Sequence, residues 1–188
     1  GDSKATLTTQ MRSQPIEIKD YRVLQEYSGP SGAGFEACIQ VDISPAERRR
    51  LERMASGLIA LTLQCEMDSG DKVVCGPGIL SSLEEGLTTA GYKLGAAPAI
   101  AYQVEAKLVA RFEAQVHQEY YAYADIHMKW ISSEGGQVVK SASLRNIKGA
   151  AFSKADAISV AMQKAVKQFR DEKLPNLTLE AMREGTTP

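Results

Sequence analysis

The chain has 188 residues, of which 44% are apolar and 24% charged, values typical of a globular protein that buries its own core. Its 22 basic residues are matched by 23 acidic ones, so there is no strong positive field to attract a nucleic acid. No stretch approaches the roughly 18 consecutive apolar residues that a membrane-spanning helix requires.

The sequence begins with Gly1-Asp2-Ser3 and has no initiator methionine, so we expect that a leader has been removed. A lipid anchor, if there is one, would lie outside this sequence. Residues 1–14 are polar and predict a flexible tail. Residues 15–56 predict an amino-terminal β-hairpin and a helix, with a glycine-rich loop over residues 28–34 and a bulge near Asp20.

This helix is predicted to begin after Ser44, because Ser44 and Glu47 form a capping box, and to end before Gly57. It contains the run Arg48-Arg49-Arg50. The three arginines could contact a nucleic acid or an anionic lipid, or they could form an ordinary solvated helix face. The solvated face is favoured, because no aromatic or further basic cluster accompanies them.

Residues 57–188 predict the main domain. Leu58–Met67 has the apolar composition of a largely buried strand. A helix follows Gly76-Pro77 and ends at Gly91, and a short strand follows at Tyr92–Leu94. The apolar residues of this helix recur at helical spacing, at Ile79, Leu80, Leu83 and Leu87.

Two long alternating runs, over residues 103–116 and 122–130, predict an antiparallel hairpin with one polar face. A turn centred on Gln118 would place Arg111 opposite Asp125, a favourable pair. The same register would place Lys107 opposite Lys129, which is unfavourable.

The last strand is predicted at Val138–Asn146, and a long helix capped by Ser153 follows and ends at Pro175. The predicted apolar stripe of that helix consists of Ala155, Ile158, Ala161, Met162, Ala165 and Phe169. The whole order predicts an α+β fold, with a mixed, mostly antiparallel sheet and two helices packed on one face. The other face of the sheet would be polar and open.

The cysteines are Cys38, Cys65 and Cys75. Cys65 and Cys75 flank a polar turn, so they could form a disulfide, or they could be two reduced, half-buried thiols. Cys38 would then be left over. It is not part of a Cys-x-x-Cys motif, which argues against a zinc or thioredoxin-type site.

No catalytic, cofactor-binding or metal-binding residues are predicted, and we expect a protein that is not an enzyme. The two histidines, His117 and His127, lack any metal-ligand spacing. A nucleophile pair would have to combine Cys38 with His127, and both are predicted on exposed strand faces. Gly76-Pro77-Gly78 precedes a helix and could hold an anion, but an ordinary turn and cap explains it better.

The best candidate for a recognition surface is the aromatic cluster Tyr120-Tyr121-Tyr123, with Trp130. Tyr121 and Tyr123 share the parity that faces away from the predicted core, as does Arg111 on the preceding strand. Exposed tyrosines are common at protein contacts, although strand propensity also explains them.

Residues Ala122–Phe169 resemble the end of domains found in bacterial envelope proteins. The resemblance rests on the strand Ala124–Met128, a Gly-Gly turn followed by Val138–Ser141, and Gly149–Ser153 before an alanine-rich helix. Such domains occur in the flagellar-assembly T protein of the periplasm, in small outer-membrane lipoproteins, and in the curli-secretion and TolB amino-terminal type.

The front of the chain carries a second resemblance. Tyr21–Tyr27, a glycine-rich loop and Ala37–Pro45 are similar to the hairpin of the flagellar T protein's first domain. The chain differs from that family in lacking a full helix before Tyr21 and in its extended Cys65–Cys75 loop. These families act as scaffolds and binding modules, so the resemblance implies no catalytic residues.

The resemblance therefore implies a periplasmic or outer-membrane-associated structural module that binds other envelope proteins or further copies of itself, as in a flagellar or secretion assembly. Its contact surface would be the open sheet face with Tyr121, Tyr123 and Arg111, or the edge strand Val138–Asn146. The alternative is a periplasmic small-ligand carrier with a pocket between the amino-terminal hairpin and the main sheet.

Overall fold

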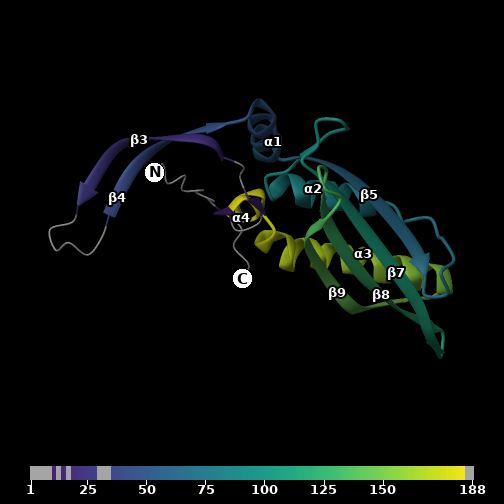
Figure 1. Cartoon of the computed structure of the whole chain (residues 1–188). Coiled ribbons are helices and arrows are strands. Elements are labelled where there is room, and N and C mark those ends of the chain that lie inside the picture. Colours follow the sequence, from purple (N-terminus) through teal and green to yellow (C-terminus); the bar gives the residue numbers. More distant parts are fainter. Residues whose placement is uncertain (1–9, 12–13, 16–17, 29–34, 185–188) are drawn as a thin grey trace. The chain divides into compact units, whose positions relative to one another are not determined.

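The computed structural model describes residues 10–11, 14–15, 18–28 and 35–184 (Figure 1). Most of the predicted glycine-rich loop therefore lies outside the described residues. The described chain forms two compact units, and the boundary between them falls within one helix, after Glu52. The first unit holds four strands and most of that helix, and the second holds Arg53–Arg183.

The first unit contains the predicted hairpin. Strands β3 (Ile18–Ser28) and β4 (Phe35–Ile43) pair antiparallel, with a register shift between Ile18 and Asp20 where the bulge is predicted. The short strands β1 (Gln10–Met11) and β2 (Gln14–Pro15) also pair antiparallel. This second pairing falls largely on residues that the sequence assigns to the tail.

Helix α1 (Pro45–Ser56) begins and ends where the sequence predicts. The Ser44 hydroxyl accepts a hydrogen bond from the Glu47 backbone N–H at 3.1 Å, which satisfies one of the free donors of the first turn. The Glu47 carboxylate accepts a 2.9 Å hydrogen bond from Arg50 Nε. Gly57 follows the helix with φ 66°, a left-handed conformation that glycine adopts without strain.

The second unit is an α+β fold built on an open five-stranded sheet, as predicted, with strand order β6-β5-β7-β8-β9. Strand β5 runs parallel to β6 and β7, whereas the β7–β8 and β8–β9 pairs are antiparallel. The strands are β5 (Leu58–Met67), β6 (Lys93–Leu94), β7 (Tyr102–Val116), β8 (Glu119–Ser132) and β9 (Val138–Ala151).

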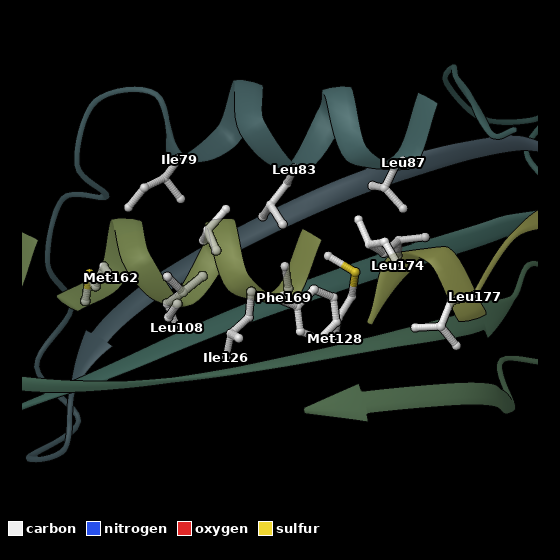
Figure 2. Packing of buried hydrophobic residues seen from close by; sticks show 14 of the residues in the cluster. Ile79, Leu83, Leu87, Leu108, Ile126, Met128, Met162, Phe169, Leu174 and Leu177 are labelled. Atoms are coloured by element: carbon white, nitrogen blue, oxygen red, sulfur yellow. The ribbon is translucent and has the colours of Figure 1, made fainter. Parts of the chain in front are cut away.

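The helices of this unit are α2 (Ile79–Thr89), α3 (Lys154–Glu172), the 3-10 helix η1 (Leu174–Asn176) and α4 (Leu179–Glu184). Helices α2 and α3 pack on one face of the sheet, as Figure 1 shows. Figure 2 shows the apolar side chains of α2 pointing toward those of α3 and of the strands beneath. The core includes Ile79, Leu83, Leu87, Leu108, Ile126, Met128, Trp130, Met162 and Phe169.

The buried stripe of α3 differs from the predicted one. Ala155 is exposed, whereas Ala157 and Val166 are buried together with the predicted Ala161. The reason is that Gly149 of β9 packs against the backbone of α3 at Ala157 and Ala161, so the side of α3 that carries these residues faces the sheet. In α2 the prediction for Leu80 is also wrong, because its side chain is 45% exposed and does not belong to the buried stripe.

The predicted register of the β7–β8 hairpin is wrong by two residues. The turn comprises only His117 and Gln118, and a bulge lies between Phe112 and Ala114. Each feature shifts the pairing by one residue, so Arg111 lies opposite Tyr123 and not opposite Asp125. The unfavourable Lys107–Lys129 pair disappears as well, because Lys129 now lies opposite Glu105.

Strand β9 continues five residues beyond the predicted end at Asn146. Asn146 has φ 62°, and the pairing with β8 shifts by one residue around it. A bulge residue interrupts the alternation without ending the strand, and pairing resumes at Ile147.

Candidate contact face of the sheet

The side of the second unit's sheet opposite α2 and α3 is here called the polar face. Its side chains come from alternate positions of β7 and β8, and they are partly or fully exposed. The three residues predicted as a contact surface, Arg111, Tyr121 and Tyr123, all lie on it. The other two aromatic residues of the predicted cluster do not, because Trp130 is fully buried in the core and Tyr120 packs near Phe112, at 6.1 Å between ring centroids.

Arg111 is held on the polar face by partners from two neighbouring strands. Its Nη2 donates a 2.6 Å hydrogen bond to Asn146 Oδ1, and its Nη1 lies 3.8 Å from Asp125 Oδ1. The guanidinium carbon stands 4.9 Å from the centre of the Tyr123 ring, within cation–π distance. A guanidinium fixed in this way presents a planar surface to solvent at a reduced entropic cost.

The backbone at the β9 bulge completes this arrangement. Asn146 donates its backbone N–H to Asp125 Oδ1 at 2.7 Å, while its side chain accepts from Arg111. The bulge therefore links the charges of β7 and β8 to β9. We refer to Arg111, Tyr123, Asp125 and Asn146 as the Arg111 cluster.

Tyr121 has its own cationic partner beside this cluster. The Lys148 ammonium lies 4.1 Å from the centre of the Tyr121 ring, and the Tyr121 hydroxyl donates a 2.7 Å hydrogen bond to Glu119. That carboxylate raises the pKa of Tyr121, because it stabilises the protonated hydroxyl. Both predicted tyrosines are thus stacked against a cation.

Two ion pairs lie on the part of the polar face that is nearer to β5. Lys107 Nζ lies 2.7 Å from Glu66, and Lys129 Nζ lies 2.8 Å from Glu105. Paired charges of both signs thus lie on the same face as the stacked aromatic rings, a composition typical of the polar rim of a protein contact.

Two members of this face, Asn146 and Lys148, were missed by the sequence analysis. The sequence does carry a signal for them. The apolar residues of the last strand have even numbers at Ala142 and Leu144 and an odd number at Ile147. Such a change of parity marks a bulge, and it would have placed Lys148 beside the tyrosines.

The candidate residues for chemistry lie on three separate elements of the described chain. His127 is exposed on β8 opposite Lys107, His117 lies in the β7–β8 turn, and Cys38 lies in β4 of the other unit. Within residues 10–184, as far as the structure describes them, no group of three or more His, Cys, Asp or Glu side chains could hold a metal ion. In the same part of the chain, every helix is too short or too polar to cross a membrane.

Cys65 and Cys75 are joined by a disulfide, with a Cα–Cα distance of 5.4 Å. Cys65 is buried in β5, and Cys75 precedes α2. The bond therefore closes the exposed loop between strand and helix.

The arginine run of α1 is solvated in part. Arg48 and Arg49 are exposed and line an open groove of about 450 Å³ with Asp42, whereas Arg50 pairs with Glu47. One acidic side chain thus accompanies the two exposed arginines.

No known family model matches the chain, and no curated protein matches it in sequence. Solved structures similar to it include a neuraminyllactose-binding hemagglutinin homolog from Helicobacter pylori, with 11% identity, TM-score 0.44, and coverage of 70% of this chain and 92% of that one. The lipoprotein GNA1162 from Neisseria meningitidis is 13% identical, with TM-score 0.41 and coverage of 61% and 98%. The PelC dodecamer from Paraburkholderia phytofirmans is 17% identical, with TM-score 0.37 and coverage of 60% and 85%. A bacterial lipoprotein and a dodecamer are thus among the solved structures similar to this chain.

Proposed function

We propose that this chain is a non-enzymatic module of the bacterial cell envelope that binds other envelope proteins through the polar face of its sheet. The observation that carries the proposal is the stacking of Arg111 on Tyr123 and of Lys148 on Tyr121, on the face opposite both packed helices. Aromatic and arginine side chains held rigid in this way are enriched at protein interfaces, because little entropy is lost when a partner covers them.

The disulfide supports a location outside the cytoplasm. Bonds of this kind form and persist in oxidising compartments such as the periplasm, whereas cytosolic thiols are kept reduced. Cys65 and Cys75 are therefore expected to be bridged where the protein works. The resemblance of Ala122–Phe169 to envelope domains points to the same compartment, periplasmic or outer-membrane-associated.

The proposal is tested by photocrosslinking in the native bacterium. A benzophenone amino acid replaces Tyr123 in the protein expressed from its own gene, and the matched control carries the same group at Thr88, an exposed position of α2. We expect an adduct with an envelope protein at residue 123 but not at residue 88, and the same adduct from the two purified proteins. Equal adducts at both positions, or none at residue 123, would contradict the proposal.

The small-ligand carrier remains the alternative. The pocket predicted for it would lie between the amino-terminal hairpin and the main sheet, which belong to different units, and it stays a prediction. Two grooves of the second unit, of about 540 and 530 Å³, are lined in part by charged side chains such as Lys167 and Arg170. A carrier of apolar ligands would need a largely apolar cavity, so these grooves do not favour it.

A further inference from the structure

The two edges of the five-stranded sheet are protected to different degrees. At the β5 edge, β6 pairs with Leu58 and Ile59, and the disulfide-closed loop bonds to the other end of the strand. Val73 donates its N–H to the Cys65 carbonyl at 3.0 Å, and Met67 donates to the Asp71 carbonyl at 2.8 Å. At the opposite edge, among the described residues, no strand pairs with the outer side of β9, which is 14 residues long.

A long unprotected edge is a template for another strand unless its side chains prevent pairing. The charges of β9 are all positive: Lys140, Arg145 and Lys148, with no acidic residue over Val138–Ala151. Like charges repel a second copy of the same strand, so these residues disfavour self-pairing through β9. They would attract an acidic strand for the same reason.

The positive charge continues onto α3 beside this edge. A groove of about 540 Å³ runs between β9 and α3. Lys164 and Lys167 of α3 line it, and Lys148 of β9 borders it while its ammonium lies over the Tyr121 ring on the polar face. Its two carboxylates belong to Asp171, which pairs with Arg170 at 3.0 Å, and to Glu172, which accepts a 2.8 Å hydrogen bond from the neutral amide of Gln168 and keeps its negative charge. The three lysines outnumber these two carboxylates. Among the described residues none of the three lysines has an acidic partner within ion-pair distance.

An added strand would meet positive charge on both of its faces. Successive side chains of a strand point to opposite sides of a sheet. On the helix side they would lie over the groove with Lys164 and Lys167, and on the other side they would lie near Lys148. Main-chain hydrogen bonds to β9 would supply affinity, and acidic side chains would supply specificity.

We propose that β9 and the adjacent lysine groove receive an extended acidic segment of another protein, which adds to the sheet as a sixth strand. This inference rests on the proposed protein-binding function and names the chemistry of one partner segment. It shares Lys148 with the polar face, but its test changes only Lys164 and Lys167 of α3, so the two can fail separately.

The first experiment is a titration of the full chain with a fluorescent decapeptide of alternating Thr and Glu, read by anisotropy. We expect binding that salt weakens, and no binding of the matched Thr-Lys peptide. The double variant Lys164→Glu/Lys167→Glu should weaken binding by about tenfold or more. The control Lys72→Glu/Lys93→Glu makes the same change of net charge at the other edge, on two exposed lysines, and should bind like the unmodified protein.

The second experiment separates strand addition from simple charge attraction. A Thr-Glu peptide with every backbone nitrogen methylated keeps the side-chain charges but has no backbone N–H to donate to a strand. We expect it not to bind, and we expect the unmethylated peptide to slow hydrogen exchange at amides of β9. Equal binding of the methylated peptide would overturn the proposal, and so would a dimer of the free protein with β9 already protected.

The outcome can be separated from that of the proposed function. If the Thr-Glu peptide fails to bind while the crosslink from residue 123 persists, only the edge proposal fails. If the peptide binds and that crosslink is absent, the polar-face proposal fails instead.

Discussion

Gly149 of β9 lies so close to Ala161 of α3 that a Cβ atom built on it would stand 2.3 Å from the Ala161 backbone nitrogen. It would also stand 2.6 Å from the Ala157 carbonyl oxygen. Both neighbours are main-chain atoms of a helix, which cannot move aside as the end of a side chain can. Strand and helix therefore pack at backbone contact, and the small residues of α3 make this approach possible.

Gly149→Ala is accordingly expected to lower the free energy of unfolding by about 2–3 kcal/mol, since overpacking forces backbone shifts. The measurement is urea unfolding followed by circular dichroism. Gly135→Ala is the matched control: its Cβ would meet only the flexible side chain of Gln137. Equal losses in the two variants would show that the close approach of β9 to α3 is not what limits this position.

Loss of the Cys65–Cys75 disulfide should destabilise the protein by about 2–3 kcal/mol, because the bond restricts the unfolded chain. The test compares unfolding of the oxidised protein with that of the reduced protein and of Cys65→Ala/Cys75→Ala. In the oxidised, denatured protein a thiol assay should find only Cys38 reactive. Three reactive thiols would show that the bond does not form.

Asn146→Ala should lower the free energy of unfolding by about 1–2 kcal/mol, because alanine is strained at φ 62° and the acceptor for Arg111 is lost. Asn146→Gly tolerates the backbone conformation and loses only the side chain, so its loss should be smaller. Thermal unfolding of the two variants measures the difference. A glycine variant as unstable as the alanine variant would mean that backbone strain contributes little.

Tyr121→Ala/Tyr123→Ala should weaken binding of the partner identified by crosslinking by about tenfold or more, as expected for aromatic residues at the centre of an interface. The free energy of unfolding should fall by about 1–2 kcal/mol, since both side chains are partly exposed and two surface cation–π contacts are lost. Tyr120→Ala, on the other side of the same strand, serves as the control for binding. The measurement is a titration of the purified pair; equal affinity of the double variant would place the contact elsewhere.

The sequence predicts the faces of this sheet better than its register. Alternation alone assigns Arg111 and Tyr123 to one face and Leu108 and Ile126 to the other, because parity follows directly from strand geometry. The register depends on the length of the β7–β8 turn and on the bulge after Phe112, and the alternating pattern encodes neither. The pairing predicted for Arg111 is therefore wrong, although Asp125 still lies 3.8 Å from it as a diagonal neighbour.

The sequence predicts only part of the candidate surface, because the register of β9 also depends on a bulge. Tyr121, Tyr123 and Arg111 stand out by residue type, whereas Asn146 and Lys148 matter only through the bulge that brings β9 beside them. The stripe of α3 shows the same limit. Ala155 and Ala157 are chemically identical, and Ala157 is the one that lies where Gly149 of β9 approaches the helix.

The disulfide described above has a consequence for enzymatic cleavage. The segment between its two cysteines includes Val74, whose side chain is 94% exposed, and it is the kind of loop that proteases nick. A single cut there would leave both fragments covalently attached, so the chain would migrate as one species until a reducing agent released them.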